Sequence, residues 1–521
     1  MSNLIKQNVL LVAPYKGPVG INDMFVAPNF GLYRIKFYIQ NKFPNISVDV
    51  LYPNLESVDF NAKKYDYIGF NLTHTTLEHD IGLIYRAKKE SQDSILMAGG
   101  IEATFIHDWL IKSAPLDLVV LGEGEEILEQ LFQNNNSAVG LKNILQIPGL
   151  VIRDKNGEPK KTLPGRFLDQ ERFSYISSLL DFSQVSYPVF WNANASQYRE
   201  PNPQEINAIR IFTGNYCPHK CTFCSSTNFL DYSYSKEGDV NKRTKVVRLI
   251  AEDTMNMIVR AYYAYNMVKT IIIDDDNFVM SLDRVNLICQ MIIASKKKGE
   301  IPEDLTFTCQ ARVDNFRTDK AKVAMSLMKD AGFRLIMYGV ESFSKKVLEE
   351  FGKSTDIGLI ENVLEQTQNT GINSLVYLIL FSPRSTKKDL WKTMMKSLNC
   401  LSKGMEVSIN FYIMDIPGSY YQKEKDLIRE YKKIPIVVNG TEVATIAKSE
   451  WLYPFDKELR NLANRVEEEY PEHEDFFKSK FGIKHIPGRI YTYIVFYAIL
   501  ELMGCHKEKK ELLEIFQKYN M

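Results

Sequence analysis

The sequence lacks an excess of charge of either sign, a long apolar run and a large set of cysteines. Lys plus Arg and Asp plus Glu each number 64 among 521 residues, so no net charge attracts nucleic acid or an anionic membrane. The longest apolar run, residues 493–500, ends at Glu501 and is too short to span a bilayer. The sequence has seven cysteines, an odd number, and its first residues lack a signal-peptide pattern. Together these features predict a reducing, cytoplasmic location.

The length and composition predict a globular chain of several domains. Hydrophobic residues make up 45% of the chain and charged residues 25%, which are ordinary globular values. A chain of 521 residues is too long for one ordinary core, so we expect two to four domains.

The first 135 residues alternate apolar, strand-like runs with stretches of helical spacing. This alternation predicts an α/β domain with a parallel, doubly wound (Rossmann-like) sheet, in which ligands bind at the carboxyl ends of the strands. Three polar or glycine-rich segments lie at the carboxyl ends of apolar runs and should share one crevice: Thr73–Thr76, Gly99–Gly100 and Gly122–Glu125. The apolar runs are residues 8–14, 47–53, 65–72, 94–100 and 116–125.

Three further regions follow this domain. Residues 136–203 are predicted to be a connector, with a hairpin turn at Asn156–Gly157. Residues 204–400 resume the alternation of strands and helices and predict a partial (β/α) barrel of the TIM type, with polar strand ends at one mouth. Residues 401–521 carry charged helical patterns and predict a small, mostly helical domain.

Three of the seven cysteines, Cys217, Cys221 and Cys224, lie within eight positions. The other four are isolated, and His219 has no partner at zinc-finger spacing, so no second ligand pair completes a tetrahedral zinc site. Three thiolates on a cubane cluster would leave one iron open to a small molecule. The alternative is a zinc knuckle that takes a distant fourth ligand.

The loop resembles the signature of the radical S-adenosylmethionine (radical SAM) superfamily. It has C-x3-C-x2-C spacing with Phe223 before the third cysteine, it follows a strand-like run, and β/α units come after it. The resemblance implies a 4Fe–4S metal centre on Cys217, Cys221 and Cys224, with S-adenosylmethionine on the fourth iron. It also implies release of a 5′-deoxyadenosyl radical that abstracts hydrogen from an unactivated carbon.

The same resemblance implies contacts to S-adenosylmethionine at the predicted strand ends. The alternative for these residues is ordinary polarity, capping and solvation at a barrel mouth. The sequence SPRS at 382–385 replaces the glycine–proline turn common in the superfamily, so we assign no role to Arg384. The implied contacts are Phe223, Asp275, Asp276, Gln310, Arg312, Glu341 and Ser342.

The first domain has no G-x-G-x-x-G after its first strand, which argues against a dinucleotide site. Four of its segments resemble the cobalamin-binding domain that precedes the radical SAM domain in one large subfamily. They are APNFGLYRIKFYI, YDYIGFNLTHTT, ILMAGGIEAT and LVVLGEGEEIL. His74 is the only nearby candidate to ligate cobalt, and a hydrogen-bonding histidine is the commoner role. The resemblance implies cobalamin contacts at Thr73, His74, Thr75, Thr76, Gly99, Gly100, Gly122, Glu123, Gly124 and Glu125.

These resemblances imply a cobalamin-dependent radical SAM methyltransferase that methylates an unactivated carbon through methylcobalamin. It would need an electron donor such as flavodoxin or ferredoxin, and its substrate, a small molecule or a peptide, is not identified by the sequence. The same cofactors also permit rearrangement, ring contraction or oxidative cyclisation. A non-catalytic cobalamin or redox sensor and an RNA methylthiotransferase are less favoured. Acidic runs near the C-terminus oppose the sensor, and a second cysteine set and a basic RNA-binding module are not visible.

Overall fold

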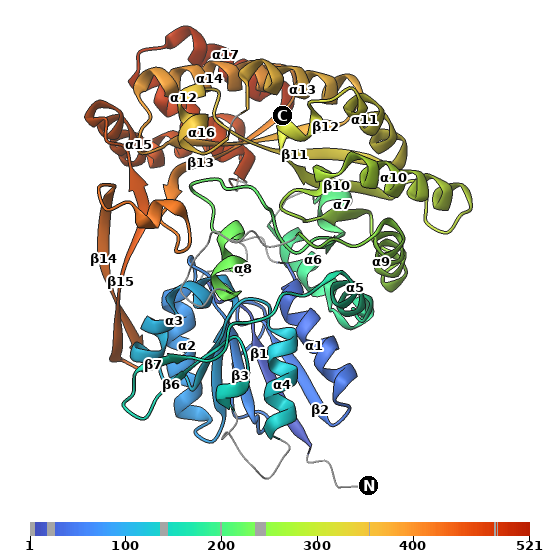
Figure 1. Cartoon of the computed structure of the whole chain (residues 1–521). Helices are drawn as coiled ribbons and strands as arrows, with labels where there is room; N and C mark the ends of the chain where they lie inside the picture. The colour runs from blue at the N-terminus through green and yellow to red at the C-terminus, as the bar shows by residue number, and fades with distance from the viewer. Residues whose placement is uncertain are drawn as a thin grey trace.

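The computed structural model describes residues 6–17, 27–135, 144–197, 201–234, 246–353, 355–483, 486 and 488–520. Two sheets organise these residues, one of seven strands near the N-terminus and one of eight strands after residue 207. Figure 1 shows the two sheets as separate α/β units, stacked one above the other. Within the described residues, no helix combines the length and the apolar character needed to cross a membrane.

The first sheet has five parallel strands followed by an antiparallel pair. Its order is β2-β1-β3-β4-β5-β6-β7, and the five parallel strands coincide with the five apolar runs. The doubly wound fold predicted for this region is confirmed. The strands are β1 (Gln7–Val12), β2 (Ile46–Leu51), β3 (Tyr67–Asn71), β4 (Ile95–Gly99), β5 (Leu118–Val120), β6 (Leu150–Arg153) and β7 (Pro159–Lys161). The helices are α1 (Phe30–Lys42), α2 (Leu77–Glu90), α3 (Gly100–Ser113) and α4 (Glu125–Asn135).

The predicted connector adds two strands to the first sheet and then forms helices that lead to the second sheet. Its hairpin turn at 154–158 is confirmed, and it joins β6 to β7, which extend the first sheet beyond residue 135. Helices α5 (Gln170–Ser178) and α6 (Tyr187–Ala195) then lead to α7 (Pro203–Ile206) below the second sheet. The start of the connector, residues 136–143, lies outside the described residues, and the three boundaries between the four predicted regions stay predictions.

The second sheet is an open, partial barrel. Six parallel strands run in the order β8 to β13, and β15 and β14 continue the sheet beyond β13 as an antiparallel pair. The strands are β8 (Ala208–Ile211), β9 (Thr270–Ile273), β10 (Thr306–Ala311), β11 (Phe333–Glu341), β12 (Asn373–Phe381), β13 (Glu406–Met414), β14 (Ile428–Val438) and β15 (Thr441–Tyr453). The helices of this region are α8 (Ser226–Tyr234), α9 (Ala251–Ala264), α10 (Leu282–Lys297), α11 (Lys320–Ala331), α12 (Lys345–Glu350), α13 (Ile357–Asn369) and α14 (Lys387–Ser402).

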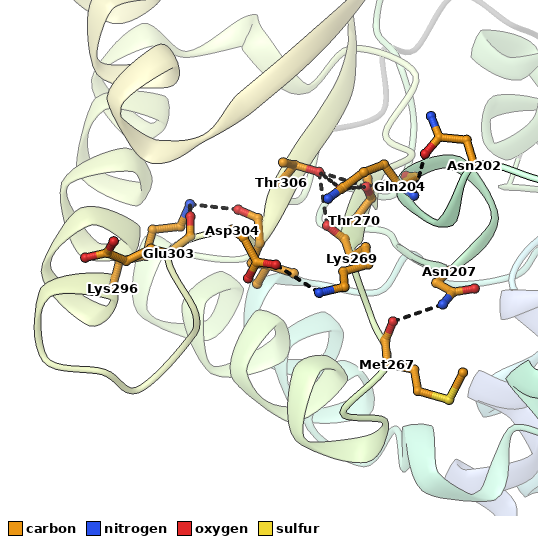
Figure 2. Close-up of polar contacts among 11 residues, drawn as sticks. Asn202, Gln204, Asn207, Met267, Lys269, Thr270, Lys296, Glu303, Asp304 and Thr306 are labelled. Atoms are coloured by element: carbon orange, nitrogen blue, oxygen red, sulfur yellow. Dashed lines mark hydrogen bonds and ion pairs between the residues drawn. The ribbon is translucent and has the colours of Figure 1, made fainter.

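Polar side chains fasten α7 to the amino ends of the barrel strands (Figure 2). The Thr270 hydroxyl donates to the Gln204 carbonyl oxygen (2.6 Å), and the Thr306 hydroxyl donates to Gln204 Oε1 (3.1 Å). Lys269 pairs with Asp304 at 2.9 Å beside them. Contacts at this end of a β/α barrel typically serve stability, so the reactive chemistry belongs at the opposite, carboxyl end.

The C-terminal region contains the expected helices and an unexpected hairpin. Helices α15 (Lys457–Phe481), α16 (Gly488–Leu502) and α17 (His506–Asn520) pack together, and α16 covers β13. The hairpin β14–β15 leaves the second sheet and reaches the first domain at α2, along the left side of Figure 1. There Ile436 and Ile446 join the hydrophobic core of the first domain. Residues 406–453 were not predicted as strands.

Candidate functional site

The cavity described here lies at the carboxyl edge of the first sheet and has about 940 Å³ of empty space, its mouth included. All six glycine-loop residues predicted at this edge line it. Asn215, Phe229 and Leu230 also line it, and they come from the cysteine loop and α8 of the second unit. The predicted residues in the wall are Gly99, Gly100, Gly122, Glu123, Gly124 and Glu125.

Backbone geometry explains why glycines form this wall. Gly100 has φ +92°, and a Cβ there would lie 2.0 Å from Asn71 Oδ1 and 3.2 Å from the Leu72 carbonyl oxygen. Gly122 has φ +72°, and its N–H donates to Thr104 Oγ1 (3.0 Å). Both residues adopt a backbone conformation that side chains disfavour. The wall is therefore backbone rather than side chain, which suits close approach of a large, flat ligand such as cobalamin.

The two predicted carboxylates of this wall are already engaged by the protein. Glu125 forms an ion pair with Arg34 of α1 at 3.0 Å, with both side chains largely buried. Glu123 Oε2 accepts from the Leu168 N–H at 3.3 Å. Arg34 lines the cavity and was not identified from the sequence, because its pairing joins two helices about ninety residues apart. Its guanidinium neutralises a carboxylate that would otherwise be buried alone.

The loop Thr73–Thr76 is separate from the described residues that line the cavity. The Thr76 hydroxyl bonds to Thr73 Oγ1 (2.7 Å) and donates to buried Asp80 (2.5 Å), so the threonines hold the turn that starts α2. Thr75 is exposed. Its neighbour His74 places Nδ1 3.1 Å from Glu102 Oε1, while His74 Nε2 is buried without a hydrogen-bond partner among the described residues. The predicted cobalamin contacts of this loop stay predictions.

The cysteine loop connects β8 to α8 and is supported from behind by distant segments. The Thr222 N–H donates to the Phe351 carbonyl oxygen (3.2 Å), and the Thr222 carbonyl oxygen accepts from the Tyr420 N–H (3.0 Å). Phe223 packs edge-on against Phe351, with ring centroids 5.1 Å apart. This contact places the Phe223 ring against an apolar cluster, so the aromatic position of the signature anchors the loop.

The three thiols are free and two have strongly raised pKa values. Burial raises the pKa of Cys217 to about 11 and that of Cys224 to about 12. Iron binding would therefore have to displace protons from both thiols. Among the described residues, no three His, Cys, Asp or Glu side chains are already in a metal-holding arrangement. The thiols nevertheless fit a cluster chemically, because cysteine thiolates are its usual ligands and these three lie on a loop that is fixed at both ends. Arg312 Nη1 lies 3.3 Å from Cys221 Sγ, where its positive charge favours the thiolate.

Two predicted carboxylates fix the ends of the cysteine loop. Asp275 accepts from the Thr213 N–H (2.5 Å), the Thr213 hydroxyl (2.6 Å) and the Gly214 N–H (3.1 Å), where β8 leads into the loop. Asp276 accepts from the hydroxyl of Ser226 at the start of α8. Burial raises the pKa of both carboxyl groups. Both carboxylates have partners within the protein at the ends of the cysteine loop, and their predicted contacts to S-adenosylmethionine stay predictions.

Gln310 and Arg312, at and after the end of β10, differ in their surroundings. Gln310 Nε2 donates to Asp274 Oδ1 (3.0 Å), which also pairs with Arg210 (2.8 Å). Arg312 forms a two-pronged contact with Asp314 (2.9 and 3.0 Å) and reaches the thiol of Cys221. Sequence analysis named neither Asp274 nor Asp314 as a partner of these residues. Arg312 is thus a predicted S-adenosylmethionine contact whose side chain donates a hydrogen bond to the sulfur of a predicted cluster ligand.

Glu341 and Ser342, at the end of β11, have different partners. Glu341 has a left-handed backbone, φ +67°, and its carboxylate pairs with Lys353 Nζ at 2.7 Å. Lys353 also donates to the Gly339 carbonyl oxygen (2.7 Å). The strained backbone and the buried lysine together hold the Glu341 carboxylate at the strand end. Ser342 is buried and bonds to Thr393 Oγ1 (3.0 Å), so its hydroxyl is used within the protein.

Comparison with known proteins identifies both domains. Residues 34–132 match the B12 binding domain and residues 211–396 match the radical SAM superfamily. An uncharacterised methyltransferase of Pyrococcus horikoshii is 24% identical over 371 residues, which cover 70% of this chain and 72% of that protein.

Two kinds of solved structure share the fold. The cobalamin-dependent S-adenosylmethionine radical enzyme OxsB, with aqua-cobalamin and S-adenosylmethionine bound, has a TM-score of 0.66 at 16% identity. The match covers 99% of this chain and 76% of OxsB. The radical S-adenosylmethionine methyltransferase TsrM of Kitasatospora setae, with cobalamin and a [4Fe–4S] cluster bound, has a TM-score of 0.61 at 14% identity. That match covers 82% of this chain and 77% of TsrM.

The two domain matches assign three cofactors to the chain. The radical SAM domain uses a 4Fe–4S cluster and S-adenosylmethionine, and the B12-binding domain uses cobalamin. The glycine-lined cavity wall suits cobalamin, and the loop of three thiols suits the cluster. The chain therefore contains a B12-binding domain followed by a radical SAM domain.

Proposed function

We propose that this enzyme transfers a methyl group to an unactivated carbon atom of its substrate. The observation that carries the proposal is the shared wall of the cavity: the glycine loops of the B12-binding domain meet Asn215, Phe229 and Leu230, which flank the three cysteines. A substrate between the two domains would be near both centres at once. The likeness to the Pyrococcus horikoshii methyltransferase supports methyl transfer as the reaction.

Each centre has its own set of residues. When bound, the cluster and S-adenosylmethionine supply the hydrogen-abstracting radical, and cobalamin supplies the methyl group. Cys217, Cys221 and Cys224 would hold the cluster, while Asp275 and Asp276 keep the ends of their loop in place.

The remaining polar groups would hold the other two cofactors. Glu341, oriented by Lys353, offers a carboxylate to the amino group or ribose of S-adenosylmethionine. Gly99, Gly100, Gly122 and Gly124 expose backbone to cobalamin.

The cell must supply an electron and keep the thiols reduced. We propose a flavodoxin or ferredoxin as the electron donor and the cytoplasm as the location. All seven cysteines are free, which suits a reducing compartment. The substrate is a small molecule or a peptide.

The test uses the full chain reconstituted with iron, sulfide and cobalamin under anaerobic conditions. With dithionite as reductant and the substrate present, S-adenosylmethionine should yield both 5′-deoxyadenosine and S-adenosylhomocysteine. Substitution of Cys217, Cys221 and Cys224 by alanine should abolish deoxyadenosine formation. The control is Cys289→Ala, which removes a buried thiol of α10 and should leave product formation intact.

A second candidate keeps the cofactors and changes the outcome to rearrangement, ring contraction or oxidative cyclisation. OxsB, which shares the fold over nearly the whole chain, is named a radical enzyme rather than a methyltransferase. Deoxyadenosine without S-adenosylhomocysteine, measured with the true substrate, would favour this candidate and contradict methyl transfer.

A further inference from the structure

Arg312 makes a contact that neither cofactor binding by the glycine loops nor anchoring of the cysteine loop explains. Its Nη1 lies 3.3 Å from the sulfur of Cys221, within hydrogen-bond distance. Arg312 is 8% exposed and Cys221 is 9% exposed, so the contact is shielded from water. A guanidinium in a poorly solvated place interacts with nearby charge more strongly than one at the surface.

Asp314 fixes the side chain of Arg312, and Asn277 fixes its backbone. Asp314, in the short helix Val313–Phe316, accepts from Nε (2.9 Å) and Nη2 (3.0 Å), so it grips one edge of the guanidinium. The remaining nitrogen, Nη1, faces Cys221. The Arg312 N–H also donates to Asn277 Oδ1 (3.4 Å), which ties it to the segment after β9. A two-pronged pair of this kind sets the direction of the third nitrogen.

Lys353, another buried cation in the described part of the chain, differs in this respect. Lys353 Nζ is used by Glu341 Oε1 and by the Gly339 carbonyl oxygen, both at 2.7 Å. Its ammonium group therefore orients a carboxylate, whereas the Arg312 guanidinium is oriented by one and directed at a sulfur. The two cations serve different parts of the site.

We propose that Arg312 raises the reduction potential of the cluster by donating a hydrogen bond to the Cys221 sulfur, with Asp314 as the residue that positions it. The inference rests on the proposed function in requiring the cluster on Cys217, Cys221 and Cys224. Reduction adds one electron from an external low-potential donor to the cluster, and no bond forms and no proton moves. Hydrogen bonds to cluster sulfurs and nearby positive charge stabilise the more negative, reduced state.

The experiment is a redox titration of the reconstituted full chain, followed by electron paramagnetic resonance, without S-adenosylmethionine and without cobalamin. Dithionite serves as the electron donor. R312Q should shift the midpoint potential to a more negative value at unchanged iron and sulfide content. D314E, which keeps both charges but displaces the carboxylate that holds the guanidinium, should shift the potential in the same direction by less. R312K keeps the charge without the fork and should lie between the wild type and R312Q.

The matched control is R34Q, which breaks a comparably buried Arg–carboxylate pair in the other domain. Its cluster potential should equal that of the wild type. A fully loaded R312Q cluster with the wild-type potential would overturn the inference. If R312Q does not retain iron, the charge-conserving variant D314E decides, and a wild-type potential in that variant overturns the inference in the same way.

Two further outcomes are kept apart by the design. If Arg312 serves only to bind S-adenosylmethionine, R312Q weakens binding of that cofactor in a separate equilibrium measurement but leaves the cofactor-free potential unchanged, which contradicts the inference. If the wild-type chain binds no 4Fe–4S cluster, the proposed function fails, and this failure is visible in the iron content before any potential is measured.

Discussion

The cavity wall at Gly100 has no room for a side chain. It combines φ +92° with a neighbouring Asn71 Oδ1 that a Cβ would approach to 2.0 Å. For Gly100→Ala we expect about 1–2 kcal/mol of backbone strain and about 1–3 kcal/mol from overpacking. Thermal unfolding should show lower stability, and the cobalamin retained per chain should fall, because relief of the clash moves Asn71 in the wall.

Gly157 is the matched control for this substitution. It has φ +84° in the β6–β7 turn, with no atom within 4 Å of the position of a Cβ. Gly157→Ala should therefore show the strain alone, with cobalamin retention unchanged. Equal losses of stability in the two variants would mean that the Asn71 side chain moves without cost and that the wall is not shaped by this contact.

His107, on α3, makes stability depend on pH. Burial, with a smaller contribution from Lys161, lowers its pKa from 6.5 to about 4 against the opposing effect of Asp108. Between about pH 4 and 6.5 the unfolded chain binds the proton more readily than the folded chain, so stability rises with pH there and levels off above pH 6.5. The total change is on the order of 3 kcal/mol, at 1.36 kcal/mol per pKa unit.

His107→Phe tests this dependence, because it keeps a ring beside Tyr232, which now lies 5.9 Å away. Unfolding followed from pH 4 to 7 should show a shallower slope in the variant than in the wild type. His506→Phe, at an exposed position of α17, is the control and should keep the wild-type slope. An unchanged slope in His107→Phe would assign the pH dependence to other groups.

The residues of the site were predictable from sequence where chemistry is local. Glycines after buried strands and a cysteine triplet are visible as short patterns, and the structure brings the glycines into one cavity wall. The partners Arg34, Asp314 and Lys353 were not predicted, since an ion pair across elements leaves no local pattern. Thr73 and Thr76 hold the turn before α2 through their own hydrogen bonds, a local role that the sequence did not indicate, and their predicted cobalamin contacts stay predictions.

At the scale of elements, the β14–β15 hairpin is the feature that sequence analysis missed. Its tip is Asn439–Gly440, with φ +51° and +78°, the Asn-Gly turn that joins two strands most commonly. The flanking residues are largely β-branched, as in IPIVV before the turn. The many lysines and glutamates of this region obscured the pattern, and charge on one face is normal for a strand that is half exposed.

The hairpin fastens the C-terminal region to the B12-binding domain. Ile436 is 4% exposed in the core around α2, whereas the next residue, Val437, is 58% exposed. Beyond them, Lys448 donates to the His74 carbonyl oxygen (2.9 Å) and pairs with Glu78 (3.0 Å). The hairpin, which belongs to the C-terminal region, therefore supports the turn of the B12-binding domain that contains His74.

Ile436→Ala should release the hairpin from α2. Truncation of a buried isoleucine costs about 2–5 kcal/mol, which corresponds to roughly 30-fold or more faster cleavage of the hairpin when proteolysis follows local opening. Limited proteolysis of the full chain, with the cut sites mapped, measures this rate. Val437→Ala changes an exposed side chain on the same strand and should leave the rate near that of the wild type. Similar rates for the two variants would show that the hairpin is held elsewhere.

At the scale of the whole molecule, separate segments join the two domains around the cavity. Gly418, in the loop after β13, packs so closely on Phe105 of α3 that a Cβ would lie 2.1 Å from its ring. The carbonyl oxygen of Gly418 accepts from Asn228 Nδ2 of α8 (2.5 Å). Helix α8 therefore contacts the first domain and the C-terminal loop together, and Figure 1 shows it between the two units. This junction could not be derived from sequence, because it depends on how finished domains pack.

The shared wall predicts that a ligand of the first domain stabilises the cysteine loop. Cobalamin bound in the cavity would contact Asn215, Phe229 and Leu230, although the B12-binding match ends at residue 132. At a free concentration 100 times its Kd, a ligand opposes any opening that releases it by about 2.7 kcal/mol, so amides exposed by that opening should exchange about 100-fold more slowly. Hydrogen exchange of the full chain with and without cobalamin should show this slowing in residues 215–230. Helix α17 is the internal control, and protection confined to the first domain would mean that cobalamin does not bridge the two.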